Sequence, residues 1–255
     1  IPLPARVREG IARLQPRLVR IFIQEFFRLL PEKDRYDWSR LDPYMDALEA
    51  TGAAVVAAIC IKPPVLYPAI DETIWRPNDP DQWHRLIQAL VHRYSVQRPL
   101  VTHWEIGNEV DIGEGGGCPY KIRDVDDYVA YYRMTVAAVR EAWPQAKVGG
   151  PAMASIDNPP MEGFVRRCRQ EGLPLDFISY HLYSDDPAAH GRLVRQAQGD
   201  LASALAILDD QEAVVRELDL PAMLQVVLGN KAAFLLGAGD LPAAAAALAE
   251  QEEIC

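Results

Sequence analysis

Short apolar runs alternate with amphipathic stretches over the first 186 residues. Apolar side chains recur at helical spacing within 7–14, 38–48, 83–94 and 129–143. Runs short and apolar enough to be buried strands lie at 18–23, 53–61, 100–106, 147–150 and 177–183. Strands that alternate with helices pair in parallel through right-handed crossovers. The pattern therefore predicts an α/β fold with a parallel sheet.

The pattern changes after Pro187, where strand-like runs stop and alanine and leucine dominate. Residues 199–215 align with 239–255 at a period of 40, with eight identities in 17 positions, and both copies begin Gly-Asp-Leu. Such a period is typical of helical-hairpin repeats, whose faces are buried only against neighbouring repeats. Chance similarity between two Ala/Leu-rich helices is the alternative interpretation.

This second segment, 187–255, resembles tetratricopeptide repeats. Leu228-Gly229-Asn230 followed by Gly239-Asp240 resembles the first helix and inter-helix turn of that family. The resemblance implies an all-α segment that binds a peptide or protein partner. About three repeats are usually needed for independent stability, so these helices are expected to pack on the first 186 residues, on another chain, or on residues outside this sequence.

Composition excludes several classes of function. The chain has 255 residues, of which 49% are hydrophobic, which suits one large domain or two ordinary ones with a real core. Its net charge of -10 disfavours nucleic acid as a partner, because binding nucleic acid requires a positive surface. No run of about 18 uncharged apolar residues occurs, so no membrane span is expected.

The cysteines and histidines give no sign of a metal or cofactor. Cys60, Cys118, Cys168 and Cys255 are far apart, without a CxxC pair, and no HExxH pattern occurs. Unpaired cysteines slightly favour a cytoplasmic location. The first residue is Ile1 rather than Met, so a signal peptide would already be absent and the localisation stays unknown.

The candidate chemistry lies directly after the predicted strand at 100–106. Asn108-Glu109 follows this strand and precedes a glycine-rich loop, 113–117. Functional groups of parallel barrels gather at the C-terminal ends of strands, where a carboxyl in a cleft can donate a proton near neutral pH. A helix-capping or loop-solvating pair is the alternative. Both side chains can share one site only if the strand breaks near Gly107.

Residues 104–109, Trp-Glu-Ile-Gly-Asn-Glu, resemble the acid/base signature on the fourth strand of the retaining glycosidases with TIM-barrel folds. Other segments resemble that clan in the same order, namely 18–21, 36–42, 148–152 and 176–183. The most similar family is glycoside hydrolase family 39, which holds β-xylosidases and α-L-iduronidases. The resemblance implies a partial (β/α)8 barrel over 1–186 and a carbohydrate substrate, with no cofactor or metal.

The resemblance also implies roles for individual residues. Glu109 would be the general acid/base, Asn108 would bind the sugar 2-hydroxyl, and Arg20 would steady the carboxylate of the nucleophile. His181 and Tyr183 would line the pocket. Trp104 would either fill the barrel or contact sugar. The alternative, purely structural interpretations are a surface charge for Arg20, a hydrogen-bonded core histidine for His181 and rim packing for Tyr183.

The second carboxyl group that retaining hydrolysis requires is not recognisable in the sequence. In this clan the nucleophile is a glutamate that ends strand seven, whereas the glutamates after Tyr183 lie in Ala/Leu-rich helical sequence. Strands one, seven and eight are not recognisable either. We therefore expect little or no glycosidase activity from this chain by itself. The alternatives are a protein-interaction protein that uses its repeats, or an inactive sugar-binding module.

Overall fold

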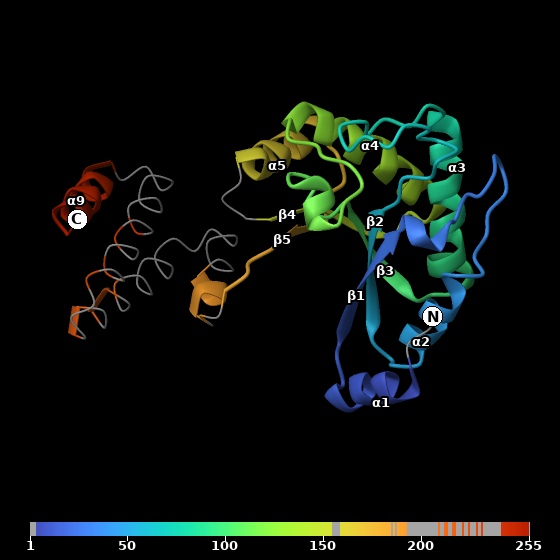
Figure 1. The fold of residues 1–255 in the computed structure, drawn as a ribbon, viewed down its shortest axis with the longest axis horizontal. Coiled ribbons are helices and arrows are strands. Elements are labelled where there is room, and N and C mark those ends of the chain that lie inside the picture. The colour runs from blue at the N-terminus through green and yellow to red at the C-terminus, as the bar shows by residue number, and fades with distance from the viewer. Residues whose placement is uncertain are drawn as a thin grey trace. The chain divides into compact units, whose positions relative to one another are not determined.

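The computed structural model describes residues 4–154, 159–184, 186, 188–192 and 241–254, with scattered positions between 209 and 231. The chain divides into two compact units, Ile1–His181 and Leu182–Cys255. The first unit is a mixed α/β fold (Figure 1), and it carries most of the candidate site residues.

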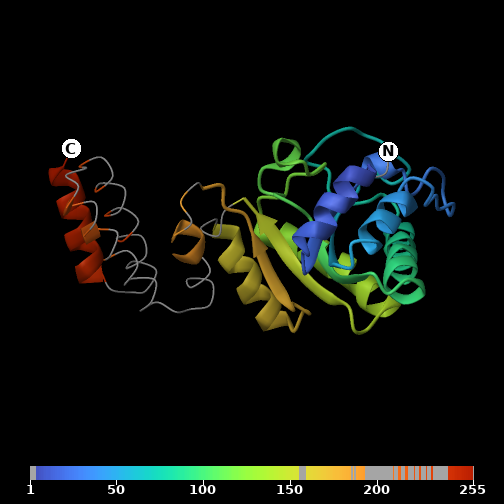
Figure 2. The same ribbon diagram turned by 90° about the horizontal axis from the view of Figure 1, so that it is seen from below.

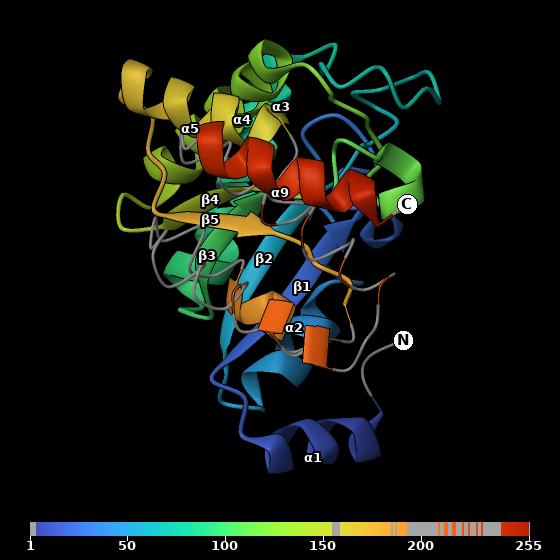
Figure 3. The same cartoon turned by 90° about the vertical axis from the view of Figure 1, so that its left-hand side faces the viewer.

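A five-stranded parallel sheet forms the centre of the first unit, with the strands in the order in which they occur along the chain. The strands are β1 (Leu18–Gln24), β2 (Ala54–Cys60), β3 (Val101–Ile106), β4 (Lys147–Met153) and β5 (Phe177–Tyr180). Figure 3 shows β1, β2 and β3 side by side. All five strands and their parallel pairing were predicted from the apolar runs, and the prediction of an α/β fold is confirmed.

Helix α1 (Ala5–Leu14) precedes β1. The helices that connect consecutive strands are α2 (Asp42–Glu49), α3 (Pro80–Val91), α4 (Val125–Ala142) and α5 (Pro159–Glu171). Helix α4 packs on α3 and α5, and α5 lies against β4 (yellow helix in Figure 2). Helix α1 has no buried residue and lies at the amino end of β1. None of the helices described combines the length and apolarity that are needed to cross a bilayer.

Local sequence explains where the longer helices begin. The Asp79 carboxylate accepts a hydrogen bond from the Gln82 N–H at 2.9 Å, and Pro80 occupies the first turn of α3. The Asp124 carboxylate caps α4 in the same way, accepting from the N–H groups of Asp126 and Asp127. The buried faces of α2, α3 and α4 join the strands in one core.

The sequence did not predict α5. Its 13 residues include two prolines and a glycine at the start and a run of charged residues at the end, so its apolar periodicity is weak. In the second unit, helix α9 (Leu241–Glu253) is described. Most of the predicted repeat segment falls outside the described residues, so the tetratricopeptide-like arrangement and the 186/187 domain boundary stay predictions.

Candidate active site

A break in strand β3 brings two neighbouring polar residues into one buried site. The strand ends at Ile106, and Gly107 has φ = +92°. A Cβ at this position would lie 2.7 Å from Val110 Cγ1, so glycine is required both by the space and by the backbone conformation. Asn108 and Glu109 are consequently both buried, with 2% and 5% of their surface exposed.

Glu109 lies where three strands end. Its backbone has φ = +44°, in the left-handed region, and its N–H donates to the Ala152 carbonyl at 2.7 Å. Its Oε1 shares a hydrogen bond with His181 Nδ1, directly after β5. The His181 N–H in turn donates to the Met153 carbonyl at 2.8 Å. The Glu109 carboxyl is therefore fixed between the carboxyl ends of β3, β4 and β5.

The glycine-rich loop after Glu109 leaves room for this carboxyl group. A Cβ on Gly116 would lie 2.5 Å from both Cβ and Oε2 of Glu109. The Gly116 carbonyl also accepts a hydrogen bond from Asn108 Nδ2 at 2.7 Å. Gly116 thus contacts both polar residues of the site, and any larger side chain there would displace Glu109.

Arg20 on β1 joins the same group of residues. Its Nε donates to Glu105 Oε2 at 2.6 Å, and a terminal guanidinium nitrogen donates to Asn108 Oδ1 at 2.8 Å. Glu105 is 2% exposed, so its negative charge is buried and compensated by this guanidinium. With Oδ1 bound to Arg20 and Nδ2 bound to Gly116, the amide of Asn108 has a single orientation.

One predicted residue, Trp104, does not join this group, and another, Tyr183, lies in a different compact unit. Trp104 is fully buried, and its indole N–H donates to Ser95 Oγ at 3.0 Å, in the segment that follows α3. Of the two alternatives for Trp104, its burial favours core packing. Tyr183 belongs to the second compact unit and is 85% exposed. The structure therefore assembles Glu109, Asn108, Arg20 and His181, and the proposed place of Tyr183 in the pocket stays a prediction.

Two residues of the site, Glu105 and Gly116, were not among the predicted site residues. The strand register held a signal for the first of these. Arg20 pairs with Val56, and Glu105 pairs with Ala58, two residues further along β2 and hence on the same face of the sheet. No comparable signal marks Gly116 among the glycines of its loop, because only the loop conformation decides which of them meets Glu109.

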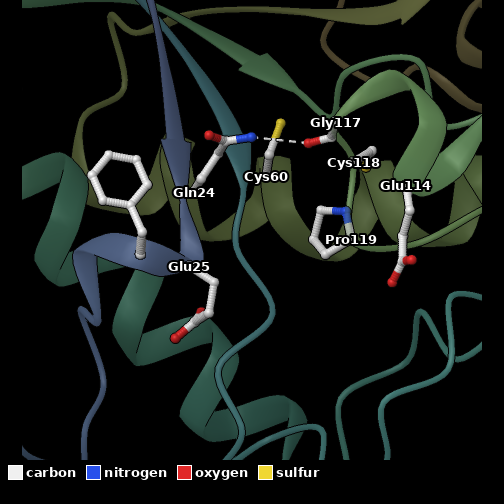
Figure 4. A pocket seen from close by; sticks show the side chains of 8 residues that line it. Gln24, Glu25, Cys60, Glu114, Gly117, Cys118 and Pro119 are labelled. Carbon is white, nitrogen blue, oxygen red and sulfur yellow. Dashed lines mark hydrogen bonds between the residues drawn. The ribbon is translucent and has the colours of Figure 1, made fainter.

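A cavity of about 330 Å³ lies beside this group, at the carboxyl ends of β1 and β2 (Figure 4). Its lining includes Gln24, Glu25, Phe26, Cys60, Glu114 and Cys118. Gln24 Nε2 donates to the Gly117 carbonyl at 3.0 Å and so bridges β1 to the glycine-rich loop. Burial raises the pKa of Glu25 to about 7, although the Lys62 N–H and the charge of Arg28 act in the opposite direction.

A metal centre is not part of the described site. Among the residues that the structure describes, no three His, Cys, Asp or Glu side chains gather closely enough to hold an ion. The chemistry available to this group is that of carboxyl, amide, guanidinium and imidazole side chains. Such groups can bind hydroxyls and transfer protons.

Comparison with known proteins identifies a family. The model of glycosyl hydrolases family 39 matches residues 26–221, and the match extends past residue 186 into the segment predicted as repeats. A β-xylosidase of Geobacillus stearothermophilus is 26% identical over 163 residues, which are 60% of this chain and 31% of that protein. A β-xylosidase of Caldicellulosiruptor saccharolyticus is 29% identical over 118 residues, 44% of this chain and 22% of that protein. This chain therefore spans about a third or less of these relatives.

Solved structures show the same fold. A glucosidase from Croceicoccus marinus superposes with a TM-score of 0.59 at 22% identity, over 82% of this chain and 47% of that one. A monomeric β-xylosidase from Caulobacter crescentus gives a TM-score of 0.59 at 21% identity, over 81% of this chain and 45% of that one. At these identities the likeness establishes the fold and nothing finer.

Proposed function

The chain belongs to glycosyl hydrolases family 39, and on that premise we propose that it takes part in hydrolysis of an O-glycosidic bond, with Glu109 as the general acid/base. Membership of this family implies a carbohydrate substrate. The relatives described as β-xylosidases support a β-linked xyloside as the first substrate to test. The observation that carries the proposal is the contact between the Glu109 carboxyl and His181 at the end of the parallel sheet.

Glu109 would act first as an acid and then as a base. In the first step its protonated carboxyl donates a proton to the glycosidic oxygen as the bond to the leaving group breaks. In the second step the carboxylate accepts a proton from the attacking water. The hydrogen bond with His181 and the left-handed backbone at Glu109 keep the carboxyl group in one position, which supports proton transfer to a bound sugar.

Asn108 would bind the sugar hydroxyl next to the reacting carbon. Its Oδ1 accepts from Arg20, and one Nδ2 hydrogen is donated to Gly116, so the second Nδ2 hydrogen is the donor to offer to a 2-hydroxyl. Sequence reasoning gave Arg20 the role of steadying the nucleophile. In the present proposal Arg20 also orients Asn108, because it binds that amide directly.

We do not assign the nucleophile to any carboxyl group at the strand ends that the structure describes. A retaining mechanism requires a second carboxyl group about 5 Å from the acid. Glu105 lies on β3, the strand that Glu109 follows, and its carboxylate is already paired with Arg20, so we do not assign it as the nucleophile. Glu25 lines the neighbouring cavity at the end of β1. We therefore keep the expectation that this chain by itself has little or no turnover, although it binds sugar.

The proposal is tested by measuring binding and turnover on the same protein. Calorimetry with xylose and arabinose oligosaccharides should detect binding to the purified chain, and Asn108→Ala should weaken it. An aryl β-xyloside reports turnover, with Glu109→Gln compared against Glu114→Gln, a matched change on the same loop. Turnover that survives in Glu109→Gln would remove Glu109 from the proposed role. A mechanism-based inhibitor followed by peptide mass spectrometry would identify the nucleophile.

Absence of binding to any of these sugars would count against the proposal as a whole. Turnover that is lost in Glu109→Gln and kept in Glu114→Gln would support Glu109 as the acid. That result would also show that the chain already contains its nucleophile, contrary to the expectation of little activity.

A further inference from the structure

Two free thiols meet at the cavity beside the candidate active site. Cys60 is the last residue of β2, and Cys118 follows the glycine-rich loop. Both residues are fully buried, both line the cavity of about 330 Å³, and each thiol shifts the pKa of the other. Figure 4 shows the two residues together beside the hydrogen bond between Gln24 and Gly117. The fold has thus brought together two cysteines that are distant in sequence.

The surroundings of the two sulfur atoms are unequal. Burial acts to raise the pKa of Cys118, but hydrogen bonds from the Cys60 thiol and from the N–H groups of Tyr120 and Asn108 outweigh it, so this pKa is lowered overall. The hydrogen bond to Cys118, together with burial, raises the pKa of Cys60. The shared proton therefore stays on Cys60, and Cys118 has the greater thiolate character. Because the thiolate is the reactive form of cysteine, Cys118 is the nucleophile of the pair.

We propose that Cys118 and Cys60 form an oxidation-sensitive pair that closes a disulfide between strand β2 and the glycine-rich loop when a peroxide reaches the cavity. The Cys118 thiolate attacks one peroxide oxygen, the O–O bond breaks, and with one proton the products are a sulfenic acid and water. The Cys60 thiol then attacks the sulfenic sulfur, forming the S–S bond and releasing a second water. Together two thiols and one hydrogen peroxide give one disulfide and two waters, so each sulfur loses one electron and the peroxide gains two.

The disulfide would affect Asn108 and Glu109, because Cys118 and Gly116 of the same loop region contact them. The Asn108 N–H donates to the Cys118 sulfur, and Gly116 packs against Glu109. Closing the bond would replace the thiolate acceptor of Asn108 and draw the loop towards β2. The cross-link itself follows from the two thiols alone, so it does not depend on the glycosidase proposal.

Cys168 provides an internal comparison. It is also free and buried, but burial raises its pKa to about 11, and no second cysteine is among the groups that set this pKa. At neutral pH it stays protonated and should react slowly. The pKa of Cys118 is lowered and that of Cys168 is raised, so Cys168 serves as the unreactive buried cysteine for comparison.

The test is peroxide treatment of the folded chain, followed by digestion at low pH without reductant and mass spectrometry. We expect a peptide pair joining Cys60 to Cys118, lighter by two hydrogen atoms and restored by dithiothreitol, while Cys168 stays reduced. Cross-linking should be roughly tenfold or more faster than oxidation of Cys168, and its rate should rise with pH to a plateau below the ordinary cysteine pKa of about 8.5.

Two variants make the result decisive. In Cys60→Ser, which keeps Cys118, a sulfenic acid on Cys118 should be trapped by dimedone, whereas Cys168→Ser should cross-link like the unchanged chain. Circular dichroism checks that each variant is folded. Oxidation that spares Cys118, or that joins other cysteines at the same rate, would overturn the proposal.

Discussion

Two regions at the same edge of the sheet hold carboxyl groups in opposite ways. At the ends of β3 and β5, Glu109 shares a hydrogen bond with His181, and the adjacent Asn108 is bound to Arg20 and Gly116. At the ends of β1 and β2, the Glu25 carboxyl lines a cavity with two thiols and a phenyl ring, and burial dominates its pKa. The comparison shows that two carboxyl groups at one edge of a parallel sheet can have very different neighbours, an imidazole for Glu109 and a cavity with thiols and a phenyl ring for Glu25.

This contrast affects how a catalytic acid is recognised. A raised pKa is a common sign of an acid/base residue, and by that sign alone Glu25 would be chosen. Geometry favours Glu109, because a proton donor must also be positioned, and Glu109 has bonded neighbours from the ends of two other strands, β4 and β5. Both carboxyl groups are largely buried, so their bonded neighbours are what distinguishes Glu109 from Glu25.

The largest expected effect tests whether Trp104 belongs to the core or to the group of polar residues around Glu109. Trp104→Ala should lower the free energy of unfolding by about 3 to 5 kcal/mol, because it empties a fully buried position between the sheet and the segment after α3. Trp104→Phe should cost less and leave sugar affinity unchanged in calorimetry. A selective loss of sugar affinity in folded Trp104→Phe would instead return Trp104 to the binding site.

The next effect tests the ion pair between Arg20 and Glu105. Arg20→Met leaves the Glu105 carboxylate buried without its partner, so urea denaturation should show a loss of about 3 kcal/mol. The double variant Arg20→Met/Glu105→Gln removes the uncompensated charge and should recover most of that loss. If the double variant is no more stable than the single one, the ion pair is not what Arg20 contributes.

A smaller effect tests the contact between Gly116 of the glycine-rich loop and Glu109. Gly116→Ala should cost about 1 to 3 kcal/mol and weaken sugar binding by roughly tenfold, because its Cβ would overlap Glu109. Gly115→Ala is the matched control, since its Cβ would meet only Ile112 Cγ2 at 3.3 Å. Equal affinities of the two variants in calorimetry would show that the position of Glu109 does not matter for binding.

The smallest effect tests the desolvated carboxyl in the other region. The folded pKa of Glu25, about 7, lies above its unfolded value of about 4.5, so the fold holds the proton more tightly and loses stability as pH rises from 4.5 to 7. Allowing for partial exposure, the loss should be about 1 to 2 kcal/mol. Glu25→Gln should flatten this part of the profile of melting temperature against pH. An unchanged slope would assign the pH dependence to other groups.

Much of the first unit could be predicted because strand signals are local. The five apolar runs gave the parallel sheet, and parallel strands bring their carboxyl ends to one edge, which is why Glu109 and His181 were expected to be neighbours. The break at Gly107 was anticipated because two adjacent residues cannot otherwise face the same way. Local pattern therefore predicted the sheet, whereas the expectation that His181 lines the pocket came from the resemblance to the glycosidase family.

Other features depend on conformations that the sequence does not specify locally. Helix α5 lacks clear periodicity, and the direction of Trp104 depends on which face of β3 meets the segment after α3. The meeting of Cys60 with Cys118 depends on the path of the glycine-rich loop. Tertiary contacts such as the hydrogen bond between Gln24 and Gly117 determine the path of the loop. The spacing of Cys60 and Cys118 along the chain therefore did not predict that the two thiols are neighbours.

The most direct test of Glu109 as the acid of a sugar site is a crystal structure of the chain with a bound xylosyl disaccharide. The proposal predicts a Glu109 carboxyl oxygen at about 2.6 to 3.2 Å from the interglycosidic oxygen, with Asn108 Nδ2 donating to the 2-hydroxyl. A disaccharide bound elsewhere, with the Glu109 carboxyl out of hydrogen-bond reach of its glycosidic oxygen, would contradict it.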